Sequence, residues 1–221
     1  SHRDSLVPCK PANLEGPDDA CARLFIKQTG RLLFRRPLTD AKVAEYVGKA
    51  HAAAEKNKDF YVGLSGVLEG WLVDPMVLMI ADTTENDPKH PGHQRLDAYS
   101  LASRLSFFLW NAAPDDYVLK AAESGDILTP KGRAKVVEMM LASPRLTQGM
   151  RAFFDDMFAF DDFDNLAKDP KVYPSFTGVT VQDAREQTLR TVVDHLITKK
   201  NDYRDLYTTR ATFMSPALAA I

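Results

Sequence analysis

Apolar residues recur every three to four positions through most of the chain, which is the period of an amphipathic helix. In the first half, this pattern predicts a helix from Pro17 to the stop at Arg35-Arg36-Pro37, a second that begins at Thr39 and a third over Tyr61 to Leu72. Proline and acidic residues favour the first turn of a helix, and Thr favours the cap before it. A short apolar turn follows at Pro75.

Proline also marks helix starts in the second half, where four prolines stand at positions 114, 130, 144 and 216. A helix that begins at Asp97 precedes them, and a long one spans roughly 181–199. The helix from Asp97 carries an apolar stripe made of Tyr99, Ala102, Leu105, Phe108 and Leu109. Because no segment alternates with the period of a strand, we predict an all-α fold without a significant sheet.

The polar segment over residues 81–95, ADTTENDPKHPGHQR, predicts a linker because it holds two prolines and a glycine. It separates two packed helical units, a small N-terminal bundle (1–80) and a larger multi-helix domain (96–221). Both ends of the chain read as cuts, so we expect a fragment of a longer protein. We also expect another segment or subunit to cover the apolar residues of the truncated last helix, which are Ala217, Leu218 and Ile221.

The composition is that of an ordinary globular protein, with 45% hydrophobic and 26% charged residues. The net charge of -2 gives no basic field of the kind that nucleic-acid binding requires. The sequence contains no run of about 18 apolar residues, so no membrane span is predicted. No secretory signal peptide is recognisable at its start.

The two cysteines, Cys9 and Cys21, enclose a loop rich in Pro, Gly and Asp. A turn-forming loop of this length suits a disulfide, which would stabilise the fold by about 3 kcal/mol on the chain-entropy model. A disulfide implies an oxidising compartment. The alternative is two free thiols. The spacing is not C-x-x-C and no histidine lies near, which argues against a metal site.

Several motifs carry a family resemblance. A helix pair, LDAYSLASRLSFFLWNAAPDD with GDIL, is followed by LASPRLTQGMRAFFDDMF, REQTLRTVVDHLI and YTTRATFMSPALAAI. Together they resemble a planctomycete-type domain family of unknown function, which occurs in large secreted bacterial proteins, often beside c-type cytochrome modules. The first half resembles the small helical domain that usually precedes this family.

The resemblance implies an exported, periplasmic or extracellular multidomain protein in a redox setting, with no established catalytic residues. The haem-attachment signature C-x-x-C-H is absent from the sequence. We therefore expect no cofactor within the chain. Any haem c would lie in the parent protein or a partner, and the alternative is a haem that is bound non-covalently. The partners would be the remaining segments of the parent protein or another subunit, such as a c-type cytochrome.

Two groups of residues are candidate ligands. His90 and His93, in the predicted linker, could share a metal ion or supply an axial haem ligand. The alternative is a solvated loop. The acidic run with Asp161, Asp162 and Asp164 offers grouped oxygen atoms, which calcium favours, although its spacing differs from an EF-hand loop. The alternative is an acidic face in water.

Three residues are candidate catalytic groups. Arg104 and Glu186 lie on two predicted helices and could form a buried ion pair between them. Asp115 and Asp116 are the other candidate partners of Arg104. Interior pairs of this kind are usually structural. His195 shares the long helix with Glu186, and a hydrogen-bonded structural histidine is the alternative there. The sequence shows no nucleophile elbow, phosphate loop or H-E-x-x-H motif.

These observations favour a helical structural and docking module of an exported, redox-associated protein, which would hold a cytochrome in place for electron transfer. The first alternative is part of an enzyme that acts on a polymer or an aromatic substrate in a cleft between the two helical units. The second is a carbohydrate-binding module, which requires exposed aromatic side chains in a row, such as Trp71, Tyr173 and Tyr203.

Overall fold

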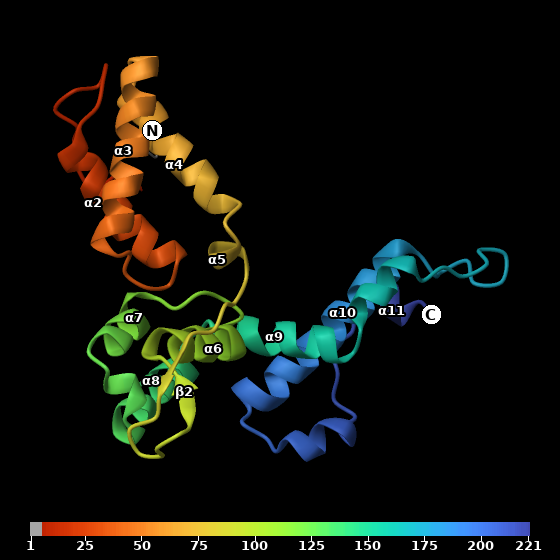
Figure 1. Cartoon of the computed structure of the whole chain (residues 1–221). Helices are drawn as coiled ribbons and strands as arrows, with labels where there is room; N and C mark the ends of the chain where they lie inside the picture. Colours follow the sequence, from red (N-terminus) through yellow and green to blue (C-terminus); the bar gives the residue numbers. More distant parts are fainter. Residues whose placement is uncertain (1–5) are drawn as a thin grey trace. The chain divides into compact units, whose positions relative to one another are not determined.

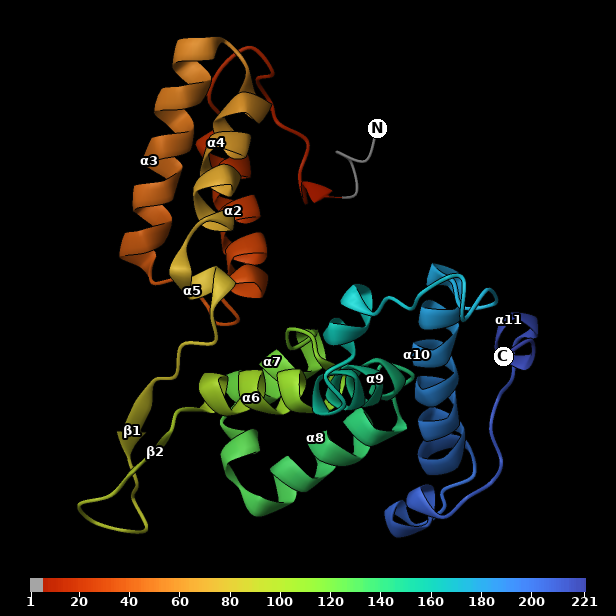
Figure 2. The same cartoon turned by 90° about the vertical axis from the view of Figure 1, so that its right-hand side faces the viewer.

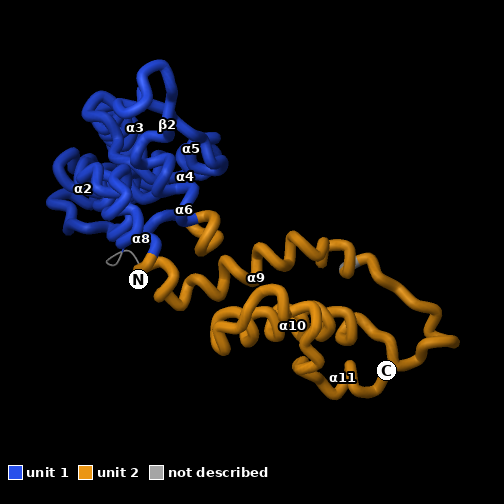
Figure 3. The backbone as a smooth tube through the Cα atoms, turned by 90° about the horizontal axis from the view of Figure 1, so that it is seen from below, with its two compact units in different colours: residues 1–106, 113–137 blue, residues 107–112, 138–221 orange. Residues whose placement is uncertain are grey.

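The computed structural model describes residues 6–221, with the side chain of Asp164 excepted. Helices account for 63% of the described residues, which confirms the all-α prediction. The backbone divides into two compact units (Figure 3): unit 1 comprises residues 6–106 and 113–137, and unit 2 comprises residues 107–112 and 138–221. In this described range, no helix has both the length and the apolar character needed to cross a membrane.

Unit 1 begins with three helices (Figure 1), which are α2 (Asp19–Leu33), α3 (Asp40–Asn57) and α4 (Phe60–Leu72). An oxygen-bearing side chain caps each of them, because Asp18, Thr39 and Asp59 accept hydrogen bonds from backbone N–H groups of the first turn. The helix starts lie within two residues of the predicted ones, which confirms the start signals.

The three helices close around a core of aromatic and aliphatic side chains. Trp71 of α4 is 1% exposed, and its ring centroid lies 5.7 Å from that of Phe34 and 5.2 Å from that of Tyr46, both edge to face. Helices α3 and α4 approach closely at Gly63, where a Cβ atom would overlap the carbonyl oxygen of Ala50. Only glycine permits this approach, so the sequence encodes the tight packing directly.

A single-turn helix, α5 (Pro75–Leu78), follows the bundle. Its carbonyl groups are bound by Arg35, a buried residue with a left-handed backbone (φ 57°). The Arg35 guanidinium donates to the carbonyl oxygens of Met76, Val77 and Met79 at 2.6, 2.9 and 2.7 Å. Burial lowers the pKa of Arg35. One side chain therefore fixes the segment that leaves the bundle.

A two-stranded antiparallel hairpin follows, the only sheet in the described part of the chain. Strand β1 (Thr84–Asn86) pairs with β2 (Gln94–Leu96), as Figure 2 shows. Across this ladder, Arg95 Nε donates to Glu85 Oε1 at 2.8 Å. The sequence pattern predicted no strand here, because an alternation of two cannot be recognised over three residues.

Four helical elements follow the hairpin: α6 (Ala98–Trp110), α7 (Asp116–Glu123), η1 (Asp126–Leu128) and α8 (Pro130–Ala142). The last residues of α6 and of α8 belong to unit 2, and the rest to unit 1. Two arginines of the bundle bind the part in unit 1. Arg31 of α2 lies 2.9 Å from Asp116 and 2.5 Å from Glu123 of α7, and Arg36 lies 3.1 Å from Asp97. Ion pairs thus join the bundle to α6 and α7 within unit 1.

The buried face of α6 differs from the predicted apolar stripe. Ala102 is fully buried as expected, but Phe108 is 73% exposed, while Ser103 and Ser106 are buried. Serine does not count as an apolar residue in the helical pattern, so the burial of these serines could not be predicted from it. The prediction that Phe108 belongs to the core stripe is therefore wrong.

Unit 2 is built on two helices and several short elements: α9 (Leu146–Met157), η2 (Phe160–Asn165), α10 (Gly178–Val193), η3 (Asp194–Thr198), η4 (Tyr203–Tyr207) and α11 (Pro216–Ala219). The π-helical η3 continues α10, so the predicted long helix is confirmed. A small core holds this unit together, formed by Phe154, Phe160, Leu189 and Val192.

Candidate functional site

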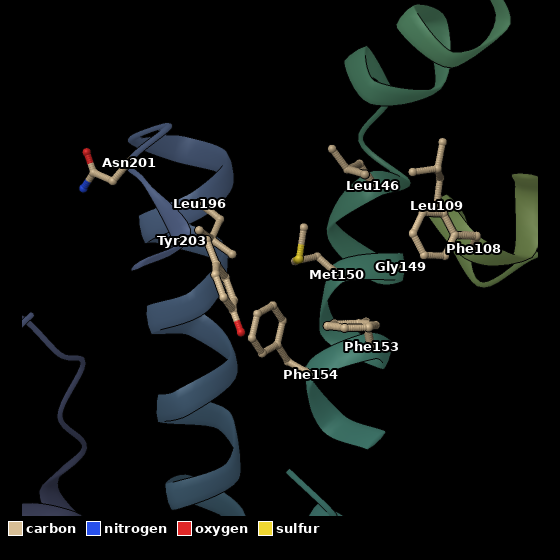
Figure 4. A pocket seen from close by; sticks show the side chains of 10 residues that line it. All are labelled: Phe108, Leu109, Leu146, Gly149, Met150, Phe153, Phe154, Leu196, Asn201 and Tyr203. Carbon is tan, nitrogen blue, oxygen red and sulfur yellow. The ribbon is translucent and has the colours of Figure 1, made fainter. Parts of the chain in front are cut away.

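An open apolar groove with a volume of about 400 Å³ lies along α9 in unit 2. Ten residues from the end of α6, from α9 and from the segment after α10 line this α9 groove: Phe108, Leu109, Leu146, Gly149, Met150, Phe153, Phe154, Leu196, Asn201 and Tyr203. Figure 4 shows Met150 and Phe154 pointing toward Tyr203. The Asn201 amide and the Tyr203 hydroxyl are the only polar side-chain groups among the ten.

The sequence of α9 places its apolar residues on one face. Leu146, Met150, Phe153 and Met157 recur every three to four positions and form a stripe along the helix. Phe153 is 53% exposed and Met157 is 47% exposed, whereas the adjacent Phe154 is 1% exposed. The core of unit 2 therefore covers only one edge of this stripe.

The end of α6 forms one side of the α9 groove. A Cβ atom at Gly149 of α9 would overlap the carbonyl group of Leu109, so glycine permits the two segments to touch. Trp110 Nε1 donates to the Met140 carbonyl at 3.0 Å, and the Arg145 guanidinium lies 4.2 Å from the centroid of the Trp110 ring. These contacts hold the end of α6, and Phe108 beside it, against α9.

The other side of the groove depends on His195. This residue is 7% exposed, and its Nε2 atom lies 3.0 Å from the carbonyl oxygen of Asp202. Because a carbonyl only accepts, Nε2 carries the proton, and Nδ1 is left to accept from the Asn201 amide at 3.5 Å. His195 thus holds the loop that carries Tyr203, which makes it a positioning residue of the groove.

The ring of Tyr203 faces the core of unit 2, and its hydroxyl faces water. Its ring centroid lies 6.2 Å from that of Phe154. Its hydroxyl lies 2.6 Å from the hydroxyl of Tyr207, and this hydrogen bond raises the pKa of Tyr207. The groove therefore has an aromatic wall with a polar rim on this side.

A second hollow of about 480 Å³ adjoins the groove and shares Phe108, Gly149 and Phe153 with it. Three carboxylates line it, from Asp155, Asp156 and Asp161, and we call them the acidic shoulder.

One arginine partly neutralises the acidic shoulder. Arg185 Nε donates to Asp155 at 2.6 Å, and Arg185 Nη2 lies 3.7 Å from Asp161, which is 96% exposed. Asp156 is exposed and makes no ion pair among the described residues. The shoulder thus keeps a net negative charge beside an apolar surface.

The calcium prediction concerned the neighbouring run with Asp161, Asp162 and Asp164. Asp161 and Asp162 are exposed, and the side chain of Asp164 lies outside the described part of the structure. Among the described residues, no group of three or more His, Cys, Asp or Glu side chains has the arrangement of a metal site. Calcium binding at these residues stays a prediction.

Arg104 does not form the expected buried pair. Its side chain is 60% exposed and binds Asp82 in unit 1. The carboxylates named as other partners are used elsewhere, since Asp115 caps α7 and Asp116 binds Arg31. The prediction of a buried Arg104 pair is wrong because Arg104 lies on the water-facing side of α6.

Glu186 lies in a surface network between α9 and α10. It pairs with Arg151 of α9, and Arg190 Nε donates to it at 2.7 Å. The hydrogen bond from Arg151, with a smaller contribution from Arg190, lowers the pKa of Glu186. Neither Glu186 nor His195 lines the α9 groove, and Arg104 belongs to the other unit. A catalytic role for these three residues stays a prediction.

His90 and His93 lie in the turn between β1 and β2. His90 Nδ1 lies 2.7 Å from Asp87, and the His90 side chain is 68% exposed. The two imidazole rings stand edge to face with their centroids 6.3 Å apart. Their exposed position agrees with the solvated-loop alternative, while ligation of a metal or haem stays a prediction.

Two family models match the chain. One, PSD4, is described as a protein of unknown function (DUF1592) and matches residues 96–221, more than half of the sequence. The chain belongs to the PSD4 family. A second model, PSD5, also a protein of unknown function (DUF1595), matches residues 21–82. These are the planctomycete cytochrome-associated domains, with the small one N-terminal. No curated protein and no solved structure matches the chain.

The PSD4 segment contains the whole α9 groove and the acidic shoulder. The cysteines lie outside it, and they form the predicted disulfide between Cys9 and Cys21. Covalent attachment of haem c requires cysteine thiols, and both cysteines of this chain are bonded to each other. The residues of this chain therefore do not fit a covalently held haem.

The aromatic row required for sugar binding is not formed. Trp71 is buried in the core of the bundle, whereas Tyr173 and Tyr203 are about half exposed. Tyr203 lines the α9 groove and Tyr173 lines a different hollow, near the end of the PSD4 segment. The expectation that Trp71 contributes to an exposed row is wrong, because its ring fills the bundle interior.

The sequence reasoning missed Phe108 and Phe153 as surface residues. A signal existed for one of them. Phe153 and Phe154 are adjacent on a helix, so their side chains point about 100° apart and one narrow core cannot cover both. No comparable signal marks Phe108, because it fits the helical stripe of the PSD4 motif.

Proposed function

We propose that this chain is a helical docking module whose PSD4 segment binds another polypeptide of an exported assembly in the α9 groove. One observation carries the proposal: two phenylalanines, Phe108 and Phe153, stand 73% and 53% exposed beside an apolar groove. Fully covering such a side chain is worth roughly 1.5–3 kcal/mol. Exposed aromatics at a pocket are typical anchors of protein interfaces.

The chemistry of the lining supports binding over catalysis. The ten residues of the groove include no carboxylate, imidazole, thiol or amine. The Tyr203 hydroxyl, the one titratable group among them, is hydrogen-bonded to Tyr207. A general base or nucleophile needs a titratable side chain within reach of the substrate, and this groove offers none that is suited to that task.

The setting of the docking module follows from the disulfide and the family. The bond between Cys9 and Cys21 fits the periplasm or the extracellular space, where disulfides persist. PSD4 and PSD5 are cytochrome-associated domains. On this basis the docked polypeptide is a c-type cytochrome domain or subunit, and the redox chemistry belongs to that partner.

The test is site-specific photo-crosslinking in the parent protein, expressed in an oxidising compartment. A photoreactive phenylalanine analogue replaces Phe153 in one variant and Tyr173 in another. The two positions are 53% and 52% exposed and lie in the same unit, so they form a matched pair. Mass spectrometry then identifies the crosslinked residues of the partner.

We expect crosslinks to one defined polypeptide from position 153 and few from position 173. Equal labelling from both positions, or none from position 153, would overturn the docking function. The ultraviolet-visible spectrum of the crosslinked partner decides the redox setting. A Soret band supports a cytochrome as the partner. A colourless partner would contradict the cytochrome assignment but not the docking function.

A further inference from the structure

The α9 groove has the length of a short helix. The α9 residues that line it, from Leu146 to Phe154, span about 12 Å at a rise of about 1.5 Å per residue, which is just over two helical turns. Leu146, Met150 and Phe153 recur along it every three to four residues, the first two half-buried and Phe153 exposed. A partner helix with anchors at i, i+3 or i+4, and i+7 matches this repeat, as in helix-in-groove recognition.

The described residues of the unit that carries the groove offer no edge for strand addition. Phe108 and Phe153 lie on one side, and Leu196 with Tyr203 lies on the other (Figure 4). Addition of an extended strand requires an open sheet edge. The described residues of unit 2 contain no strand, so they offer no such edge.

The charge beside the groove selects the partner. The three carboxylates of the acidic shoulder carry three negative charges, and Arg185 contributes one positive charge, which leaves a net charge of -2. Helix α9 ends at Met157, next to this shoulder, so the negative end of its dipole adds to the field. A cationic side chain at the edge of the docked segment is stabilised here, and an acidic one is repelled.

From these observations we propose that the α9 groove binds an amphipathic helix of the partner whose apolar face is flanked by Lys or Arg residues placed over Asp155, Asp156 and Asp161. This proposal rests on the docking function and names the class of its ligand.

The first experiment selects helices from a displayed library against the disulfide-bonded chain. Each peptide has about 15 residues, with Leu fixed at the i, i+3, i+4 and i+7 positions and with the flanking positions drawn from Lys, Glu and Gln. We expect Lys to be enriched over Glu. An enrichment of Gln or Glu, or the absence of any selected sequence, would overturn the proposal.

The second experiment locates the binding site of the selected peptide by fluorescence anisotropy. We expect Phe153→Ala to weaken binding by about tenfold or more, as at an interface anchor, and the matched Tyr173→Ala to leave it unchanged. Circular dichroism verifies that both variants are folded. Equal binding by Phe153→Ala and the parent chain would place the peptide elsewhere and contradict the proposal.

The third experiment isolates the charge. The double variant Asp156→Asn with Asp161→Asn should weaken binding several-fold and flatten its dependence on salt, since screening acts on the remaining charges only. Asp126→Asn, an exposed carboxylate of unit 1, is the control. An unchanged salt dependence in the double variant would contradict the role of the acidic shoulder.

Two further outcomes separate this inference from the docking function. A concentration-dependent dimer in sedimentation velocity, lost in Phe153→Ala, would show that the groove binds a second copy of the chain and would overturn the cationic helix. Crosslinks from position 153 to a loop or an acidic helix would leave docking intact and remove only the helix proposed here.

Discussion

The bundle of α2, α3 and α4 and the region around α9 use aromatic residues in opposite ways. In the bundle, Trp71 and Phe60 are at most 2% exposed, and the three helices cover them completely. Along α9, Phe154 is buried, but Phe153 and, beside it, Phe108 face water. The bundle leaves aliphatic side chains such as Leu32 and Leu72 in water but no aromatic ring, whereas α9 leaves a phenylalanine ring exposed. This contrast is why the proposed function is assigned to the second region.

The two regions also differ in how their helices begin. Side chains cap α2, α3 and α4, whereas α9 starts at Arg145 without a side-chain cap. The start of α9 is instead held by tertiary contacts, such as Arg145 over the ring of Trp110. Local sequence signals therefore define the bundle, and long-range contacts define the α9 groove.

The largest expected effect tests whether the bundle depends on its buried aromatic side chains. Trp71→Ala removes the largest buried side chain of the bundle and should lower the free energy of unfolding by about 5 kcal/mol, the upper end for such changes. Guanidinium unfolding followed by circular dichroism measures it. Leu72→Ala, on the next residue and 53% exposed, should change stability by less than about 1 kcal/mol. Similar losses in the two variants would contradict the comparison.

The next largest effect distinguishes a core residue of α9 from an exposed residue of its groove. Phe154→Ala should cost about 4 kcal/mol, because the ring is 1% exposed and its removal leaves a cavity. Phe153→Ala should change stability by no more than about 0.5 kcal/mol, because the ring is already half in water. The same unfolding measurement applies to both. A large loss in Phe153→Ala would assign that side chain to the fold and remove it as an anchor.

The disulfide is expected to stabilise unit 1 by a smaller amount. The double variant Cys9→Ser with Cys21→Ser should lose about 3 kcal/mol, because the unfolded chain regains the loop entropy. Differential scanning calorimetry measures the loss, and the reduced parent chain should match the variant. A groove-bound peptide should bind the variant with unchanged affinity at temperatures where both are folded, since both cysteines precede the PSD4 segment.

The smallest effect is a pH dependence in unit 2. Glu186 has a pKa below its ordinary value of 4.5 because Arg151, and then Arg190, bind its carboxylate. The folded pKa is lowered, so the stabilisation is present above the unfolded pKa and is lost as the pH falls through the folded one.

We expect the stability difference between the parent chain and Glu186→Gln to be constant near neutral pH and to shrink at pH values below 4.5. Urea unfolding at a series of pH values measures it. Glu138→Gln is the control, because Glu138 is exposed and makes no ion pair among the described residues. A difference that grows on acidification would contradict the sign.

Local signals were enough to predict most of the fold. Asp18, Thr39 and the prolines at positions 130 and 216 stand at or directly before the starts of helices, as expected from capping chemistry. The disulfide followed from the turn-rich loop between the cysteines. These features act over a few residues, so the sequence alone reveals them.

The site was harder to predict because it depends on contacts between distant residues. The contact of Gly149 with Leu109 and the bond from His195 to Asp202 have no signature in the sequence. On α6 the serines are buried and Phe108 is exposed, against the rule that a regular apolar stripe is buried. Hydrophobic spacing predicts which residues share a face, and only the packed structure tells which face is covered.

The carbonyl groups around Arg35 also define how the PSD5 segment can be separated from the rest. Three carbonyl oxygens of residues 76–79 accept from a guanidinium that is buried beyond the end of α2. A truncation after Leu72 would remove these three acceptors and leave the guanidinium to be hydrated instead. A shortened protein that ends beyond Ile80 keeps all three acceptors. Arg35 therefore ties the end of the PSD5 segment to a position more than 40 residues upstream, and a shortened version should keep both.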